Sequence, residues 1–387
     1  MYLLSEKQTS CMGCGACVDI CPKKCISMIE DKEGFLYPKV LRDVCIECHL
    51  CEKVCPINYS VDQVSKEEVV KVGIHRNEKI IKKSSSGGAF TAIMKTVLEK
   101  GYEIWGVKFD ENWKVVHDLG GTLKECESFQ KSKYILSDTN HCFSKIEKQL
   151  KSGQKILFSG TPCQCAALKN YLNLKRTNQD GLVVIDIICH GAPNQGIFNA
   201  YIEEQEKIEK AQILSYEFRN KEPIRNEINS RSARIQFSNG TNKIVTFAND
   251  PFLKGYYTRL FYRPSCGQCK FAQPNRVSDL TIGDAWGVEK IYSDLNPLIG
   301  VSLLIANSSK GVRLLECIEN DFELCSATKE WAIKANAQLR KPTEMHKGRK
   351  KFFKLYKKGF SKAVRKSAKK SLIRKTASFI KHKLLRR

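Results

Sequence analysis

The feature that most constrains this chain is a pair of cysteine runs within its first sixty residues. Each run has the spacing C-x-x-C-x-x-C-x-x-x-C-P, with Cys11, Cys14, Cys17 and Cys21 in the first and Cys45, Cys48, Cys51 and Cys55 in the second. Such spacing wraps three thiolates around one corner of a small inorganic cluster. The runs therefore predict two 4Fe-4S clusters. Zinc is the alternative, but a zinc site has no need of a third and a fourth cysteine followed by proline.

The same spacing predicts how the ligands divide. In this pattern the fourth cysteine of each run ligates the other cluster. We therefore expect Cys11, Cys14 and Cys17 to join Cys55 in one set, and Cys45, Cys48 and Cys51 to join Cys21 in the other. The pattern is the signature of bacterial two-cluster ferredoxins. It predicts a chain that moves electrons.

Length and cysteine use set the broad organisation. With 387 residues the chain is long enough for two or three domains. We expect a two-cluster ferredoxin-type domain over 1–60, a body over 61–340 and a basic tail over 341–387. Oxygen-labile clusters fit a reducing compartment. The first residues do not resemble a signal peptide, and no apolar run approaches the ~18 residues of a transmembrane helix, so we predict a cytoplasmic protein.

Most of the net charge lies in the tail. Residues 341–387 hold 19 Lys or Arg and one acidic residue, which accounts for +18 of the total of +24. Apolar residues recur between them mostly three or four positions apart: Phe353, Tyr356, Phe360, Val364, Leu372, Ile373, Ile380 and Leu384. This pattern predicts a basic amphipathic helix, or two helices broken near Gly359.

An anionic membrane surface is the partner that such a tail predicts. Each basic residue near anionic lipid contributes about 1 kcal/mol, which would place the protein peripherally at the inner face of the membrane. Nucleic acid is an unlikely alternative because no recognisable nucleic-acid-binding fold surrounds the tail. A solvated basic tail without a partner is the other alternative.

The body predicts a mixed α/β fold. Three apolar segments, 155–158, 182–188 and 279–282, are typical of buried strands, and each is followed by glycine, polar or cysteine residues. In open α/β sheets, ligands bind at the carboxyl ends of the strands. Residues 234–245 alternate around Asn239-Gly240, which predicts a β-hairpin. We expect a largely parallel sheet with antiparallel additions, behind an α+β ferredoxin domain and before a helical tail.

A serine and glycine segment precedes a predicted helix that ends at Gly101. Ser85, Ser86, Gly87 and Gly88 stand at its start, and two lysines lie just upstream. Free N–H groups at a helix N-terminus, together with small side chains, suit a phosphate-bearing cofactor. An ordinary serine cap followed by flexible glycines explains the segment equally well.

Four body cysteines lie at strand ends or in a loop. Cys163 and Cys189 each follow a predicted strand, and Cys266 and Cys269 form a C-x-x-C pair in a loop. Together they predict a third 4Fe-4S cluster. The alternative is that Cys163 and Cys189 are small buried residues and that the pair binds zinc or nothing.

Six motifs occur in an order that resembles a known family. They are Ser85-Ser86-Gly87-Gly88, Ser132-Lys133-Tyr134, Gly160-Thr161-Pro162-Cys163-Gln164, Cys189-His190-Gly191, Cys266-x-x-Cys269 and Gly283-Asp284-Ala285-Trp286-Gly287. Over roughly residues 71–315 the chain resembles the coenzyme F-420 hydrogenase/dehydrogenase beta-subunit family, many members of which carry a ferredoxin module in front. The tail is similar to that of members from bacterial surface-polysaccharide clusters.

The resemblance implies an iron-sulfur flavoprotein oxidoreductase. FAD would lie in the body beside a 4Fe-4S cluster, as in the plant relative 7-hydroxymethyl chlorophyll a reductase, which takes its electrons from ferredoxin. The residues expected to contact FAD are Ser85, Ser86, Gly87, Gly88, Lys133, Tyr134, Gly160, Thr161 and Pro162. The resemblance names neither the substrate nor the direction of electron flow.

A mechanism follows from these parts. Clusters carry one electron at a time, most organic reductions need two, and a flavin converts between them. We expect ferredoxin or another redox partner to load the clusters and FAD to reduce an unidentified organic substrate. His190 and Asp284 are the candidate proton donors, although each could instead be an ordinary loop or turn residue. The rival hypothesis is a non-catalytic electron-transfer subunit.

Overall fold

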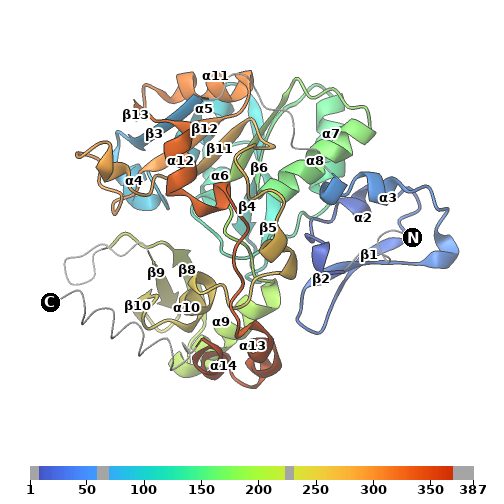
Figure 1. Cartoon of the computed structure of the whole chain (residues 1–387), viewed down its shortest axis with the longest axis vertical. Coiled ribbons are helices and arrows are strands. Elements are labelled where there is room, and N and C mark those ends of the chain that lie inside the picture. Colours follow the sequence, from blue (N-terminus) through green and yellow to red (C-terminus); the bar gives the residue numbers. More distant parts are fainter. Residues whose placement is uncertain (1–7, 59–68, 223–230, 369–387) are drawn as a thin grey trace.

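The computed structural model describes residues 8–58, 69–222 and 231–368. Its N-terminal part is a small module that lies to one side of the body (Figure 1). The module contains helices α2 (Ala16–Ile20) and α3 (Leu50–Lys53) and an antiparallel pair of strands, β1 (Ile26–Glu30) and β2 (Leu36–Val40). This is the ferredoxin-like arrangement that the cysteine runs predict.

An eight-stranded mixed sheet forms the centre of the body. Its order is β13-β3-β12-β11-β7-β6-β4-β5. The strands are β3 (Val69–His75), β4 (Tyr102–Phe109), β5 (Val115–Gly120), β6 (Lys155–Gly160), β7 (Leu182–Ile187), β11 (Leu280–Asp284), β12 (Ser302–Ala306) and β13 (Phe322–Ser326). Strands β11, β7, β6 and β4 pair in parallel, whereas the pairings of β12, β3, β13 and β5 with their neighbours are antiparallel. The sheet is thus less parallel than the sequence predicts.

Helices cover both faces of this sheet. Helices α5 (Ala89–Glu99) and α11 (Ser309–Ile318) pack on one face, and α7 (Cys142–Lys151) and α8 (Pro162–Leu174) pack on the other. Strand β7 is apolar and buried along nearly its whole length because it has a helical layer on each side. The carboxyl ends of β6, β7 and β11 therefore meet at one edge of the sheet.

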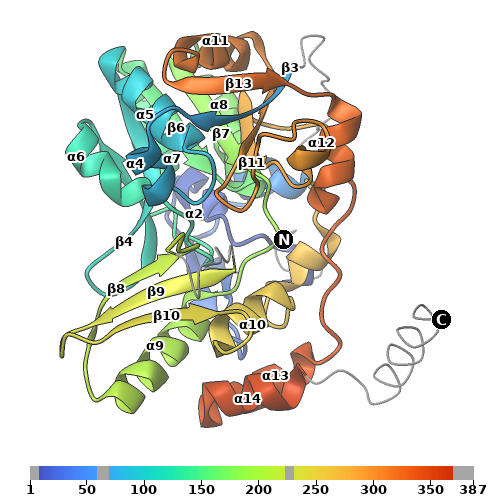
Figure 2. The same ribbon diagram turned by 90° about the vertical axis from the view of Figure 1, so that its left-hand side faces the viewer.

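A second, three-stranded sheet lies below the large one in Figure 2. Strands β8 (Ile213–Phe218), β9 (Ser232–Phe237) and β10 (Asn242–Thr246) are antiparallel and pack against α9 (Gln195–Glu209) and α10 (Pro251–Tyr257). The hairpin predicted around Asn239-Gly240 is confirmed, and Gly240 has the positive φ of 84° that the turn requires.

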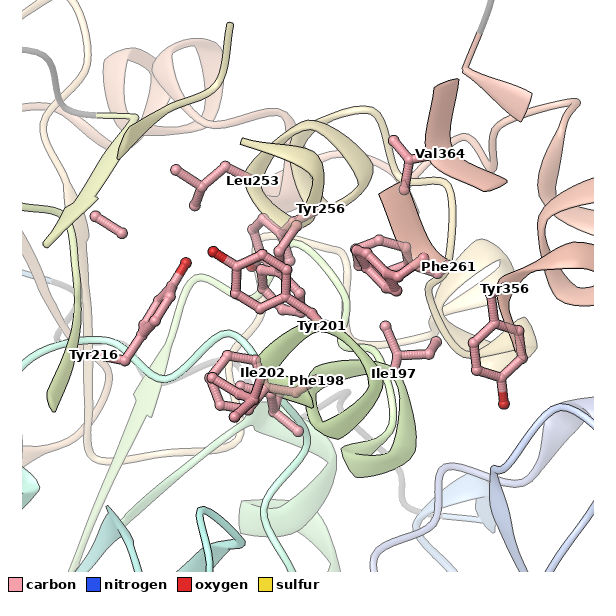
Figure 3. Packing of buried hydrophobic residues seen from close by; sticks show 14 of the residues in the cluster. Ile197, Phe198, Tyr201, Ile202, Tyr216, Leu253, Tyr256, Phe261, Tyr356 and Val364 are labelled. Atoms are coloured by element: carbon pink, nitrogen blue, oxygen red, sulfur yellow. The ribbon is translucent and has the colours of Figure 1, made fainter. Parts of the chain in front are cut away.

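The C-terminal helices do not project from the body. Helices α13 (Arg349–Leu355) and α14 (Phe360–Ser367) are separated by a short 3-10 turn and Gly359, so the predicted break is confirmed. Tyr356, Phe360 and Val364 are 5%, 1% and 1% exposed and join the aromatic core formed by α9 and α10 (Figure 3). The apolar side of these two helices is thus covered by protein, which corrects the expectation that it faces lipid. Leu372, Ile373, Ile380 and Leu384 lie outside the described residues.

The remaining elements are short. They are α4 (Glu78–Lys83), α6 (Leu123–Cys126), α12 (Lys329–Ala335) and the 3-10 helices η1 (Gln8–Ser10), η2 (Arg42–Val44), η3 (Pro56–Asn58), η4 (Glu127–Phe129), η5 (Pro264–Gln268), η6 (Val288–Lys290), η7 (Ala337–Leu339) and η8 (Tyr356–Lys358). Among the described helices, none combines the length and the apolar character needed to cross a membrane.

The module docks directly on the body. Helix α2 packs against α7 and α8, and η1 packs against η5. Thr139 donates a hydrogen bond to the carbonyl of Cys14 at 3.1 Å, and Asn170 donates to the carbonyl of Cys55 at 3.3 Å. Two cysteines of the first predicted set are therefore held by side chains of the body.

Candidate redox site

The structure brings the first predicted thiol set together. The pKa of Cys14 is raised well above its usual value by burial and then by Cys55, Cys17 and Cys11. The pKa of Cys17 is likewise raised by burial, Cys11 and Cys55. Like charges raise a thiol pKa only when they lie close together, so these four side chains face one another. The grouping is the crossed set that the spacing predicts.

The second set lies on the outer side of the module. Cys21, Cys45, Cys48 and Cys51 line one cavity of about 120 Å³, and Cys48 is exposed. The pKa of Cys51 is raised by burial, Glu52, Cys48 and Cys21. A fifth thiol, Cys25, lies in the same cavity with its Sγ 3.4 Å from that of Cys21. Cys25 lies outside the ligand spacing of both runs, so the sequence pattern does not mark it as a ligand.

The four body cysteines also converge. Burial raises the pKa of Cys189 most, and Cys266, Cys163 and Cys269 raise it further. Cys163 lies in the first turn of α8 directly after β6, Cys189 follows β7, and Cys266 belongs to η5. The edge at which β6 and β7 end therefore meets the C-x-x-C loop, as the strand-end argument predicts.

None of these sets is compact. All 18 cysteines are free thiols. Within the described ranges, no three His, Cys, Asp or Glu side chains are close enough to ligate one metal ion together.

The Ser85–Gly88 loop packs tightly against the sheet. A Cβ on Gly87 would lie 2.5 Å from the carbonyl oxygen of Gly73, and Gly88 has φ +95°. Both glycines are buried, and no described residue accepts a hydrogen bond from their N–H groups. Buried N–H groups at the start of α5 that lack an acceptor are the donors that a phosphate can use.

The Ser132–Tyr134 segment meets this loop. The N–H and Oγ of Ser132 donate to Ser85 Oγ at 2.8 and 3.1 Å. Lys133 Nζ donates to the carbonyls of Ser128 and Gln130 at 2.7 and 2.6 Å, and burial lowers its pKa to about 7. Lys133 therefore holds its own loop closed, and its predicted contact with FAD stays a prediction.

Tyr134 belongs to an aromatic group between the loop and Cys189. Its ring stacks on that of Tyr256 with centroids 4.1 Å apart, and its hydroxyl lies 3.2 Å from that of Tyr257. Burial raises the pKa of Tyr256, and Cys189 is among the groups that raise it further. The aromatic group therefore extends from the third thiol set to Tyr134.

Gly160, Thr161 and Pro162 lie at the third thiol set. At the start of α8, Gln164 Oε1 accepts from the N–H of Thr161 at 3.1 Å and from its Oγ1 at 2.9 Å, and this Oγ1 lies 3.2 Å from Cys163 Sγ. Pro162 occupies the first helical turn, where the missing N–H costs nothing. These three residues position Cys163, and a contact with FAD remains a prediction for them.

Asp284 lies in a bidentate ion pair with Arg219. Arg219 Nη1 donates to Asp284 Oδ2 at 2.5 Å and Arg219 Nη2 to Oδ1 at 3.1 Å, with side chains 11% and 19% exposed. Burial opposes the charge of Arg219, but Asp284 raises the pKa of the guanidinium above its usual value. The pair fixes the position of the carboxylate, and the role of Asp284 as a proton donor stays a prediction.

His190 lies beside this ion pair and remains in contact with solvent. Its pKa is lowered by the surrounding protein, and Asp284 partly opposes the shift. Thr343 holds its backbone by donating to the carbonyl oxygen at 2.5 Å. A neutral imidazole near neutral pH can relay a proton, so the predicted role of His190 stays open.

Sequence reasoning missed two cations. Arg219 and Lys221 follow β8, outside the quoted motifs, and only the short R-N-K segment after a strand marks them. Lys221 Nζ donates to the carbonyls of Ile81 and Ser86 at 2.7 and 2.6 Å. Burial and the charge of Arg219 lower its pKa to about 7. The segment places positive charge directly beneath the Ser85–Gly88 loop.

Comparison with known proteins now defines the class. A 4Fe-4S dicluster domain matches residues 10–59, and the family model for the C terminus of the coenzyme F420 hydrogenase/dehydrogenase beta subunit matches residues 153–330. The chain is therefore an iron-sulfur protein with a dicluster module. More particularly, residues 153–330 match the C-terminal domain of the coenzyme F420 hydrogenase/dehydrogenase beta subunit, the family that the order of motifs resembles.

Two curated relatives support this assignment. The chain is 25% identical over 221 residues to the F subunit of the F(420)H(2) dehydrogenase of Methanosarcina mazei, covering 54% of this chain and 61% of the relative. It is 27% identical over 248 residues to the beta subunit of the F420-dependent formate dehydrogenase of Methanocaldococcus jannaschii, covering 62% and 57%. The chain thus spans about three fifths of the length of each relative.

One solved structure is also similar. It is a chain of the F420-reducing [NiFe] hydrogenase complex from Methanosarcina barkeri, with 16% identity, a TM-score of 0.45 and coverage of 77% of this chain and 90% of that one.

Proposed function

We propose that this protein is an iron-sulfur flavoprotein oxidoreductase that passes electrons from ferredoxin or another redox partner, through three 4Fe-4S clusters, to FAD and then to an organic substrate. The observation that carries the proposal is the proximity of the first thiol set to the third. Cys14 and Cys17 border the same apolar core as Cys163 and Cys269, and the aromatic group at Cys189 extends to Tyr134.

The donor sets support clusters rather than zinc. Each brings four cysteines together, and the first two sets lie in the region that matches a 4Fe-4S dicluster domain. The second set would receive electrons because Cys48 is exposed. The first set borders the same apolar core as Cys163 and Cys269, which places it next to the third.

The body residues fit a flavin dinucleotide. The buried N–H groups of Gly87 and Gly88 would bind its pyrophosphate, and Lys221 would supply positive charge behind them. The aromatic group around Tyr134 would lie between the cofactor and Cys189. Bound there, a flavin would exchange single electrons with a cluster and electron pairs with a substrate.

The chain's own residues would prepare the site for an anionic or electron-rich substrate. The Arg219–Asp284 pair fixes a guanidinium beside Trp286, 5.7 Å from the ring centroid. His190 could then supply a proton from a solvent-accessible position.

A non-catalytic electron-transfer subunit is the second candidate. The names of both relatives describe subunits, so a partner enzyme could perform the chemistry. The two candidates differ in one observable property. An enzyme binds flavin and turns over a substrate alone, whereas a relay subunit needs its partner.

Anaerobic purification followed by iron, sulfide and flavin analysis tests the proposal. We expect about twelve irons per chain, four for each cubane, and one FAD. Cys14→Ser and Cys266→Ser should each lower the iron content by up to one cluster, whereas Cys317→Ser, which changes a thiol outside all three sets, should not. Zinc in the third set, or iron without flavin, would contradict the proposal.

A further inference from the structure

Arg263 is a buried cation that lies between the first and third thiol sets. Only 2% of its surface is exposed. None of the ion pairs within the described ranges includes it, although a buried charge is costly unless an opposite charge compensates it. The two neighbouring thiol sets would each carry negative charge once they hold metal.

The contacts of Arg263 join the two sets directly. Its Nε donates to the carbonyl oxygen of Cys11 at 2.7 Å. Its own carbonyl oxygen accepts from the N–H of Cys266 at 3.0 Å. Two hydrogen bonds and the covalent bonds of one residue therefore connect a predicted ligand of the first cluster with a predicted ligand of the third.

Other contacts fix the guanidinium in this position. Nη2 donates to the carbonyl of Leu36 at 2.8 Å, and the guanidinium lies 4.4 Å from the ring centroid of Tyr37. The N–H of Arg263 donates to Ala192 at 2.9 Å, three residues after Cys189. A Cβ on Gly13 would lie 2.8 Å from Nη1, so the guanidinium lies directly against the first cysteine loop, with no room there for a larger residue.

We infer that Arg263 couples the first cluster to the third: its two hydrogen bonds form the path for electrons into the body, and its charge is the counter-charge that both clusters share. The inference rests on the proposed function. Arg263 is a positioning residue because it contacts ligand backbones rather than a cofactor. Removing its charge should make an added electron less stable on both clusters.

The test uses the full chain with its clusters and flavin loaded. Arg263→Gln removes the charge and the planar guanidinium that donates through both Nε and Nη2. Arg263→Lys keeps the charge but cannot make both contacts. Arg349→Gln is the matched control, because Arg349 also ties the module to the body, through Glu33 and Tyr262, but contacts no ligand cysteine. Flavin reduction is followed after mixing with reduced ferredoxin and, separately, with dithionite.

We expect Arg263→Gln to slow flavin reduction by ferredoxin about 10- to 100-fold, the effect of a small displacement in a pre-organised site. Reduction by dithionite, iron and flavin should be unchanged, and the midpoint potentials of two clusters should fall in an EPR-monitored titration. Arg263→Lys should slow transfer with a smaller change of potential. Arg349→Gln should leave the rate unchanged and should shift the potentials less than Arg263→Gln, because the charge of Arg349 acts on Cys266 but is paired with Glu33.

Two results would overturn the inference: a wild-type rate and wild-type potentials in Arg263→Gln, or equal slowing in Arg349→Gln, which would show that docking alone matters. If ferredoxin does not reduce the flavin even in the wild-type protein, the proposed function fails instead. The potentials of Arg263→Gln then still decide whether the residue is the shared counter-charge.

Discussion

The ion pair between Arg219 and Asp284 defines the electrostatics of the body site. Both carboxylate oxygens accept from one guanidinium, and Arg219 Nε is buried without a partner in the described part of the chain. Arg219 also has a left-handed backbone, with φ 59°, which L-residues adopt at a cost. A site that holds a strained residue, an unpaired donor and a fixed charge is suited to binding a ligand.

Asp284→Asn should lower stability by about 3–5 kcal/mol, because it leaves the largely buried Arg219 without its counter-charge. The double variant Asp284→Asn with Arg219→Gln should regain a substantial part of that loss. Thermal or denaturant unfolding of the two single variants and the double variant gives the coupling energy. Additive losses would show that the pair contributes little, and that Asp284 serves some other purpose.

Lys221 predicts a pH dependence of flavin affinity. Because its pKa is lowered to about 7, the amine is charged below that pH and loses its charge as the pH rises through 7. Affinity for an anionic cofactor should therefore decrease between pH 6 and pH 8.5, by roughly the fivefold to tenfold that one charge-assisted hydrogen bond contributes. Flavin titration of the apoprotein at both pH values measures the effect, and Lys221→Gln should abolish most of the difference.

At the level of elements, the C-terminal helices act as part of the body core. Phe360 packs on Tyr201 and Phe352 with ring centroids 5.7 Å away in each case. Phe360→Ala should cost about 3–5 kcal/mol, the usual cost of deleting a fully buried aromatic side chain. The melting temperature measures this loss. An unchanged melting temperature would show that α14 is not held in the core.

Removal of residues 369–387 tests the membrane contact of the tail separately from the packing of its helices on the body. This segment carries eight of the 19 basic residues of the tail and none of the buried aromatic residues. The shortened protein should keep its melting temperature and cofactors but sediment less with vesicles that contain anionic lipid. High salt should release the full-length protein from the same vesicles. Equal sedimentation of both proteins would exclude this segment as the membrane contact.

Patterns among residues close together in the sequence predicted the features that such short segments determine. The crossed cysteine sets, the Asn239-Gly240 hairpin and the helix before Gly101 each depend on residues a few positions apart. Amphipathic spacing correctly predicted helices in the tail. It could not predict what their apolar side contacts, because the apolar side of a basic amphipathic helix can pack against either lipid or protein. Arg219 and Arg263 could not be found, since their partners lie 65 and 252 residues away.

At the level of the whole molecule, electrons would enter on the outer face of the module. Leu41, Val44 and Ile46 flank the second thiol set and are 59%, 48% and 56% exposed. Ile46→Asp should weaken reduction by ferredoxin, because it places a charge in an apolar contact. Leu214→Asp, at an equally exposed position on the small sheet, is the control. Steady-state reduction over a range of ferredoxin concentrations should show a raised KM for Ile46→Asp alone.

The docking of the module has a consequence for biosynthesis. Arg349 binds Glu33 across 316 residues of sequence, so this contact forms only when the ribosome has made almost the whole chain. At typical rates of translation, roughly 15 to 60 s separate the two residues. Cys14, which is 8% exposed in the finished protein, has neither Thr139 nor Arg263 beside it at first. Iron and sulfide can therefore be delivered to the module while it is still nascent, before the body closes over the first cluster.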